Sequence, residues 1–123
     1  MEINDPGYAY SLEILNQDDG VNTPNIIQFV NKDYSGTTMQ EVLRVLISKI
    51  KHEDTEFPSV FNNNIILILR EAIYHLEYKH SSFQCLMKEF YDEIRTTNWS
   101  KAYKGIEDII PCNKCGYFVC KEC

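Results

Sequence analysis

Residues 57–79 read FPSVFNNNIILILREAIYHLEYK and carry the clearest structural pattern of the chain. The tripeptide Phe57-Pro58-Ser59 predicts a tight turn, because proline fixes its own φ and has no backbone N–H to donate. Asn62 is expected to cap the helix that follows, although Asn63 and Asn64 compete for that role. The helix is apolar around much of its circumference, through Ile65, Leu67, Ile68, Leu69, Ala72, Ile73 and Leu76. So much apolar surface predicts burial against a second helix or another subunit.

A second helix is predicted just before this turn, starting at about Thr38. Either Thr37 with Gln40 or Thr38 with Glu41 fits a capping box, in which paired side chains satisfy the free amides of the first turn. Apolar residues then recur at helical spacing; they are Met39, Val42, Leu43, Leu46 and Ile50. Because the two helices are joined by a short turn, the chain is expected to contain an antiparallel helical hairpin.

The segment after Lys79 keeps a helical pattern, with apolar residues spaced by three and four. These residues are Phe83, Leu86, Met87, Phe90, Tyr91 and Ile94. Cys85 lies on the same segment and is expected to be a small packing residue. We favour one long helix over about residues 64–95, and the alternative is two helices with a kink at Ser81. A short helix that ends at Pro111 is also expected.

The N-terminal part of the chain predicts strands. Residues 1–7 are expected to be a loose lead-in. Apolar and aromatic side chains then alternate, at Tyr8, Tyr10, Leu12 and Ile14. Residues 16–20, NQDDG, are typical of a turn, and residues 26–30, IIQFV, predict a second strand.

The fold class expected from these elements is α+β. An N-terminal antiparallel β-hairpin is followed by an antiparallel helical hairpin and a small Cys-rich C-terminal tail. We expect residues 1–99 to form the main domain and residues 100–123 to hold the short helix and the four-cysteine tail.

The composition limits the classes of function. The chain has 123 residues and a net charge of −6, which disfavours binding to nucleic-acid polymers and to acidic membranes. It has no apolar run of about 18 residues, and its N-terminus lacks the basic segment of a signal peptide. We therefore expect a soluble, cytoplasmic protein of one domain with a small appendage.

Four of the five cysteines lie close to the C-terminal end, at Cys112, Cys115, Cys120 and Cys123. Two C-x-x-C pairs would supply four thiolates to a tetrahedral zinc ion, whose role would be structural. Gly116 follows the first pair and lets backbone amides turn toward a thiolate. Only four residues separate the pairs, fewer than in typical zinc ribbons, so a tail of reduced thiols is the alternative.

The sequence carries no recognisable catalytic motif. His52, His75 and His80 lack the H-E-x-x-H spacing of a metalloprotease. There is no phosphate-binding glycine loop and no G-x-S-x-G motif. The protein is therefore expected to bind rather than to catalyse.

The order of these segments resembles the phage family of signal-sequestering proteins that includes the Thoeris anti-defence sponge and its anti-CBASS relative. The similarity covers about residues 8–83. LEILNQDDG followed by IIQFV is similar to the family's strand, turn and strand, and TTMQEVLRVLISKI and FPSVFNN are similar to its first helix and its turn. The family places Leu, Ala, Leu, Leu and Arg at positions that hold Leu69, Ala72, Ile73, Leu76 and Lys79.

This resemblance implies an oligomer, a dimer or a hexamer, with ligand pockets between subunits. The ligand would be a cyclic nucleotide or a cyclic ADP-ribose-type immune messenger, which is trapped without being degraded. If the protein is phage-encoded, it would act in the host cytoplasm. Asn62 and Lys79 from different chains would contact its phosphate, and Phe57 or Phe83 would stack on its base. Phe83 stands where the family has a second arginine.

A second hypothesis belongs to another class. In it the protein is an interaction adaptor whose zinc-bound tail docks a host protein, and there is no small-molecule ligand. Self-association through the apolar helix is compatible with both hypotheses.

Overall fold

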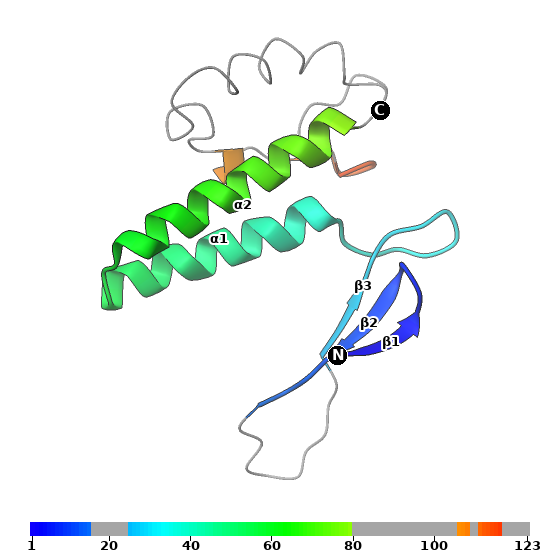
Figure 1. Ribbon diagram of the computed structural model, residues 1–123. Helices are drawn as coiled ribbons and strands as arrows, with labels where there is room; N and C mark the ends of the chain where they lie inside the picture. Colours follow the sequence, from blue (N-terminus) through cyan, green and yellow to red (C-terminus); the bar gives the residue numbers. More distant parts are fainter. Residues whose placement is uncertain (16–24, 80–105, 109–110, 117–123) are drawn as a thin grey trace. The chain divides into compact units, whose positions relative to one another are not determined.

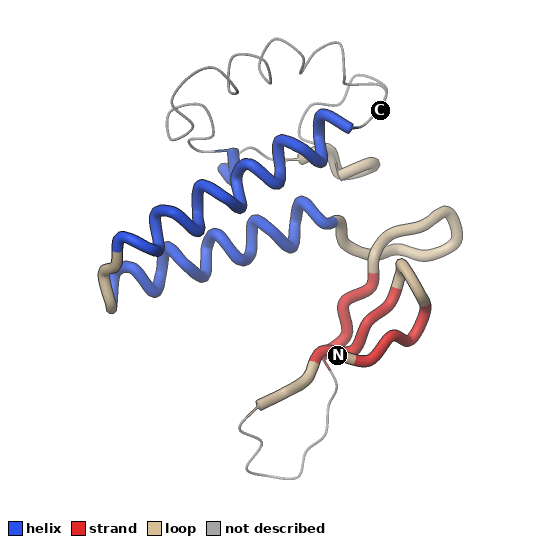
Figure 2. The backbone as a smooth tube through the Cα atoms, viewed as in Figure 1, coloured by secondary structure: helices blue, strands red, loops and turns tan. Residues whose placement is uncertain are grey.

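The computed structural model describes residues 1–15, 25–79, 106–108 and 111–116 (Figure 1). These residues divide into two compact units, residues 1–38 and 39–123. The first unit is a small antiparallel sheet, and the second is a pair of helices with a short 3-10 helix (Figure 2). The predicted α+β class is therefore confirmed.

The sheet has three strands, and one of them was not predicted. Strands β1 (Glu2–Asp5), β2 (Ala9–Leu12) and β3 (Asn25–Gln28) are antiparallel in the order β1-β2-β3. The interpretation of residues 1–7 as a loose lead-in is wrong, because Glu2 and Ile3 pair with Ser11 and Tyr10. Gly7 makes the connecting turn with φ +83°, a conformation that residues with a side chain rarely adopt. The predicted turn at residues 16–20 lies outside the described residues.

Aromatic packing and a close backbone approach join the sheet to the segment that follows it. The rings of Tyr10 and Phe29 meet edge to face, with centroids 6.1 Å apart. Thr37 pairs with Phe29, and its N–H donates to the carbonyl oxygen of Gln28 over 2.8 Å. A Cβ on Gly36 would lie 2.5 Å from that same oxygen, so only glycine fits there. The segment before the first helix is therefore held against β3.

The helical hairpin is formed by α1 (Met39–Glu56) and α2 (Val60–Lys79), which lie side by side (Figure 1). Thr38 immediately precedes α1, in the position where a capping residue was expected. The polar end of α1 carries two pairs at i, i+4 spacing, Lys49 with Glu53 and His52 with Glu56. The predicted continuation of α2 to about residue 95 lies outside the described residues. Within the described residues, neither helix is long and apolar enough to cross a membrane.

The predicted cap of α2 is wrong. The helix starts at Val60, and the Ser59 hydroxyl accepts a hydrogen bond from the N–H of Phe61 over 3.2 Å. Asn62 therefore lies inside the first turn. Its side-chain amide donates to Asp54 Oδ1 over 2.9 Å, which ties α2 to the end of α1. Ser59 takes the capping position because the turn places it directly before the first residue of α2.

The core of the helical unit contains isoleucines from three elements, α1, α2 and the 3-10 helix η1 (Ile106–Asp108). Ile47 and Ile73 are fully buried, and Ile106 of η1 is almost so. Half-buried apolar residues surround them, namely Leu43, Ile50, Leu69 and Tyr74. Because Ile106 is part of this core, η1 is packed on the hairpin despite its distance in sequence.

Candidate functional site

Glu107 of η1 forms ion pairs with two cations of the helical hairpin. Its carboxylate receives two hydrogen bonds from Arg70 of α2, over 2.9 Å from Nε and 2.5 Å from Nη2. Lys51 of α1 lies 2.6 Å from the same carboxylate. The Glu107 side chain is only 6% exposed and that of Arg70 13%, so this ion pair is largely removed from water. One acidic residue of η1 therefore contacts both helices of the hairpin.

The two cations control the ionisation of Glu107. Burial favours the neutral carboxyl group, but the hydrogen bonds from Arg70 and Lys51 outweigh it and lower the pKa of Glu107 from 4.5 to about 2. A smaller example occurs at the α1–α2 turn. There the hydrogen bonds from Asn62 and the Ser59 backbone lower the pKa of the half-buried Asp54 carboxyl group. Both carboxylates are thus stabilised in their charged form by the fold.

The lowered pKa of Glu107 predicts acid sensitivity. Its stabilising contribution is complete above the unfolded pKa of 4.5 and is lost as the pH falls toward about 2. We expect the Tm of the helical unit to fall steadily through this interval when it is followed by circular dichroism. Glu107→Gln should remove much of that pH dependence. Asp108→Asn is the matched control, because Asp108 is the exposed neighbour; an equal effect of both variants would contradict this role of Glu107.

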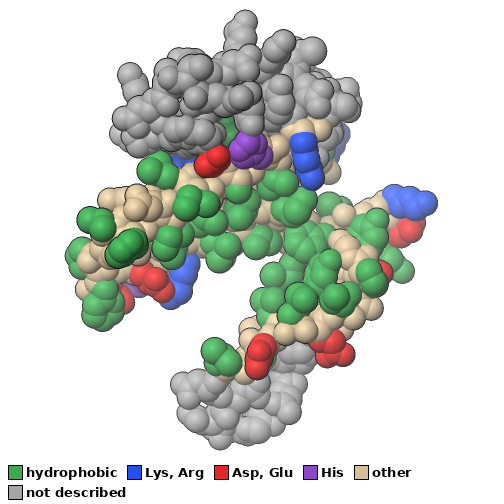
Figure 3. Space-filling view, viewed as in Figure 1, with side chains coloured by type: hydrophobic (Ala, Val, Ile, Leu, Met, Phe, Trp, Pro, Cys, Tyr) green, Lys and Arg blue, Asp and Glu red, His purple; other side chains and the backbone are tan. Residues whose placement is uncertain are grey.

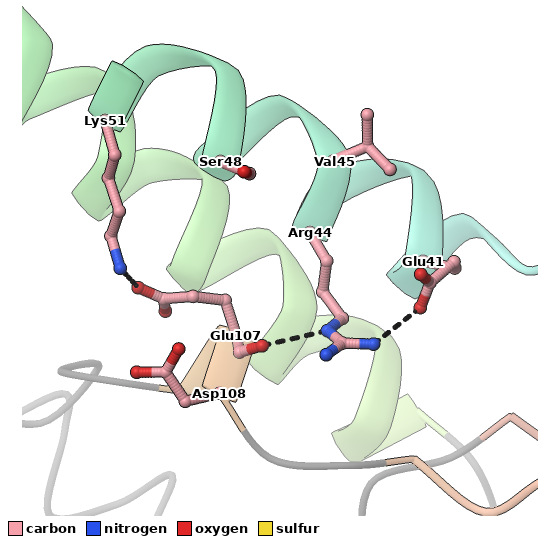
Figure 4. A pocket seen from close by; sticks show the side chains of 7 residues that line it. All are labelled: Glu41, Arg44, Val45, Ser48, Lys51, Glu107 and Asp108. Carbon is pink, nitrogen blue, oxygen red and sulfur yellow. Dashed lines mark hydrogen bonds and ion pairs between the residues drawn. The ribbon is translucent and has the colours of Figure 1, made fainter.

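A pocket of about 370 Å³ lies beside this contact, between α1 and η1 (Figure 4). Arg44 and Lys51 point from α1 toward η1, and Glu41 and Asp108 bring negative charge to the same space (Figure 4). Arg44 donates to the Glu107 carbonyl oxygen over 2.9 Å and pairs with Glu41 over 2.7 Å. Both cations are thus engaged by the protein itself, and their geometry serves to hold η1 on the hairpin.

Asn62 and Lys79, which were predicted to share a phosphate across two subunits, lie near opposite ends of α2 within one chain. Asn62 directs its amide to Asp54 of its own chain. Lys79 is the last residue of α2 and is exposed, and no ion pair is described for it within residues 25–79. Phe57 is 77% exposed in the α1–α2 turn. Phe83 lies outside the described residues.

A row of side chains, here called the outer face of α2, was not recognised from the sequence. It follows three- and four-residue spacing and consists of the half-buried Ala72 and the exposed Phe61, Ile65, Ile68, His75 and Lys79. Phe61 is 69% exposed and Ile68 63%. Apolar side chains are visible on the surface of the helical unit (Figure 3). The spacing from residue 61 to 79 could have revealed the row, but the sequence does not tell which side of α2 meets α1.

The first cysteine pair forms a tight turn. The N–H of Gly116 donates to the Cys112 carbonyl oxygen over 2.8 Å, and Cys112 and Cys115 are half-buried. No group of three or more potential metal ligands occurs among the described residues. Cys120 and Cys123 lie outside them, so the predicted zinc site stays a prediction.

Comparison with protein-family models, with curated proteins and with solved structures found no match to this chain.

Proposed function

We propose that the protein is a non-catalytic, self-associating binding protein that sequesters a nucleotide-type messenger in pockets between its subunits. The observation that supports this proposal is the outer face of α2. It carries an exposed aromatic ring at one end, an exposed cation at the other and apolar residues between them. Such a face offers both a surface for self-association and the two groups that a nucleotide needs.

Helix geometry explains why two chains are required. Phe61 and Lys79 are eighteen positions apart, which is about five full turns, so they lie on the same side of α2 but about 27 Å from each other. One small ligand cannot reach both within one chain. In an antiparallel pair of α2 helices, Phe61 of one subunit would lie beside Lys79 of the other. A twofold axis would create two such pockets, with Ile68 near the middle of the interface.

The side chains at both ends of the outer face of α2 are of the kinds that bind nucleotides. Base stacking on an aromatic ring contributes about 1–3 kcal/mol. Lysine binds phosphate as a point charge, and the positive end of the partner's α2 dipole would lie at the same place. The Phe57 ring offers a second stacking surface beside Phe61. In this proposal Lys79 contacts the phosphate, as the sequence predicted, and Phe61 of the other subunit stacks on the base.

The direct test is Lys79→Ala. We expect this change to weaken binding of a cyclic nucleotide or a cyclic ADP-ribose-type messenger by about 1.5–3 kcal/mol, the usual contribution of a hydrogen bond to a charged group. The measurement is titration calorimetry, after a thermal-shift screen has chosen the messenger. Lys49→Ala is the matched control, because Lys49 is an exposed lysine of α1 that already pairs with Glu53.

Self-association is tested separately through Ile68→Ala. The variant should weaken the oligomer and lower messenger binding with it, while Lys79→Ala should leave the oligomer intact. Light scattering that reports a 14.4 kDa monomer of the parent at micromolar concentration would contradict the shared pocket. Equal messenger binding by the parent and Lys79→Ala would contradict the role of the lysine.

The adaptor hypothesis has one observation in its favour. Phe57, Val60 and Phe61 form a largely exposed apolar group at the α1–α2 turn, which would suit a protein partner. Mass spectrometry of the supernatant released by heating the purified protein distinguishes the adaptor hypothesis from the sequestration hypothesis. A nucleotide in that supernatant supports sequestration, and its absence together with no thermal shift by any messenger supports the adaptor.

A further inference from the structure

The two edges of the N-terminal sheet differ. At one edge, the segment before α1 lies against the end of β3, where the Thr37 N–H donates to the Gln28 carbonyl oxygen over 2.8 Å. At the other edge lies β1, which pairs with β2 and with no other strand among the described residues (Figure 1). An edge strand directs backbone N–H and C=O groups away from its sheet. The outer edge of β1 is therefore a place where a further strand can pair.

The side chains of β1 give the two faces of this edge different chemistry. Glu2 pairs with Ser11 and Asp5 with Ala9, and the register shifts between Ile3 and Asp5. The two partners are two positions apart on β2, so Glu2 and Asp5 lie on the same face of the sheet. Ile3 follows Glu2 directly, lies on the opposite face and is 54% exposed. The edge thus presents two exposed carboxylates on one face and an apolar side chain on the other.

The negative charge of the chain is concentrated in the unit that contains this edge. Residues 1–38 contain six acidic residues and one basic residue, so they carry −5 of the net charge of −6. A second copy of β1 is a poor partner, because in the fully overlapping antiparallel pairing Glu2 of one copy would lie opposite Asp5 of the other. Like charges in opposite cross-strand positions destabilise a sheet. A basic partner is favoured instead, since the field of this unit attracts it.

We propose that the outer edge of β1 binds an extended segment of a partner protein in which basic residues alternate with apolar ones. The backbone of this segment pairs with β1 as a fourth strand, a known mode of peptide recognition. Because the side chains of a strand alternate between faces, its lysines or arginines lie beside Glu2 and Asp5, and its apolar residues lie beside Ile3. This interaction goes beyond messenger binding and uses the other compact unit of the chain.

Peptide binding tests the proposal. A capped peptide of about eight residues that alternates lysine with valine should bind the full chain in a fluorescence-anisotropy titration. The same peptide with glutamate in place of lysine should not bind. No binding of the lysine–valine peptide up to about 1 mM, or equal binding of both peptides, would overturn the proposal. Lys79→Ala should bind the lysine–valine peptide as the parent does, so a failure of messenger binding is a separate result.

Neutral variants test the charged contact. The double variant Glu2→Gln, Asp5→Asn should weaken binding of the lysine–valine peptide about tenfold, because it removes both cross-strand charge pairs. The double variant Glu13→Gln, Asp33→Asn is the matched control, since it removes the same charge from exposed residues of the same unit outside β1. The control should change binding less than about twofold, because salt screens charges that are not in contact. Equal losses in the two double variants would overturn the contact with β1.

Hydrogen exchange tests the backbone pairing. Amide exchange in β1, followed by NMR, should slow when the lysine–valine peptide is bound, because the outward N–H groups of the strand become hydrogen-bonded. The amides of α1 serve as the internal control and should exchange as they do without peptide. Peptide binding that adds no protection to the amides of β1 would overturn the proposed fourth strand.

Discussion

Arg70→Ala is expected to lower the free energy of unfolding of the helical unit by about 3–5 kcal/mol, the usual effect of removing one partner from a buried ion pair. The reason is the charge that remains. The Glu107 carboxylate is 6% exposed, and Arg70 provides two of its hydrogen bonds. Without them the carboxylate must either stay charged with Lys51 alone or take up a proton. Chemical denaturation followed by circular dichroism measures the change.

Two further variants separate burial from charge. Lys49→Ala breaks an exposed pair, whose side chains are 64% and 46% exposed, and should cost less than about 1 kcal/mol. The double variant Arg70→Met, Glu107→Leu removes both buried charges and should recover most of the loss, since apolar residues of similar size replace buried ion pairs well. Lys51 is 44% exposed and can be hydrated once Glu107 is gone. If Arg70→Ala costs no more than Lys49→Ala, the pair does not stabilise the fold.

Ile73→Ala is expected to lower the free energy of unfolding by about 2–5 kcal/mol. Ile73 is fully buried and lies in the core with Ile47 of α1 and Ile106 of η1. The shortened side chain leaves a cavity bordered by three elements, so no single movement can fill it. Denaturant unfolding at fixed protein concentration gives the value.

Val45→Ala is the control for this core prediction. Val45 lies on the same hairpin but is 60% exposed, so its truncation should change stability by no more than about 0.5 kcal/mol. Similar effects of the two substitutions would show that the Ile73 side chain is not packed as described. A large effect of Ile73→Ala together with a small effect of Val45→Ala supports the core.

The helical hairpin could be predicted because its information is local. Apolar spacing and the Phe57-Pro58-Ser59 turn specify both helices within a short segment. The N-terminal cap of α2 was harder to predict, since Ser59 and Asn62 are both good capping residues. Only the position of the turn decides between them. Strand β1 escaped prediction because Glu2, Asn4 and Asp5 lack apolar alternation. Its pairing depends on β2 and on the turn at Gly7.

The charged contact at Glu107 could not be predicted from the sequence. Its partners Arg70 and Lys51 lie on two different helices, and no spacing rule relates them to η1. The outer face of α2 is easier to predict, because its periodicity is present in the sequence. The sequence pattern does not tell which side of α2 faces α1. The burial of Ile66 and Ile73 identifies that side. The sequence analysis named Lys79 as a candidate binding residue, and it did not name Phe61.

The span of the Glu107 contacts also has a consequence for the order in which the protein folds. The Asp54–Asn62 contact closes over 8 residues, while Glu107 reaches Arg70 over 37 and Arg44 over 63. Each doubling of a loop adds about 0.6 kcal/mol of closure entropy, so the longest contact costs about 2 kcal/mol more to close than the shortest. We expect the helical hairpin to form early and η1 to pack on it last. By the same argument η1 is the first element to leave during local unfolding.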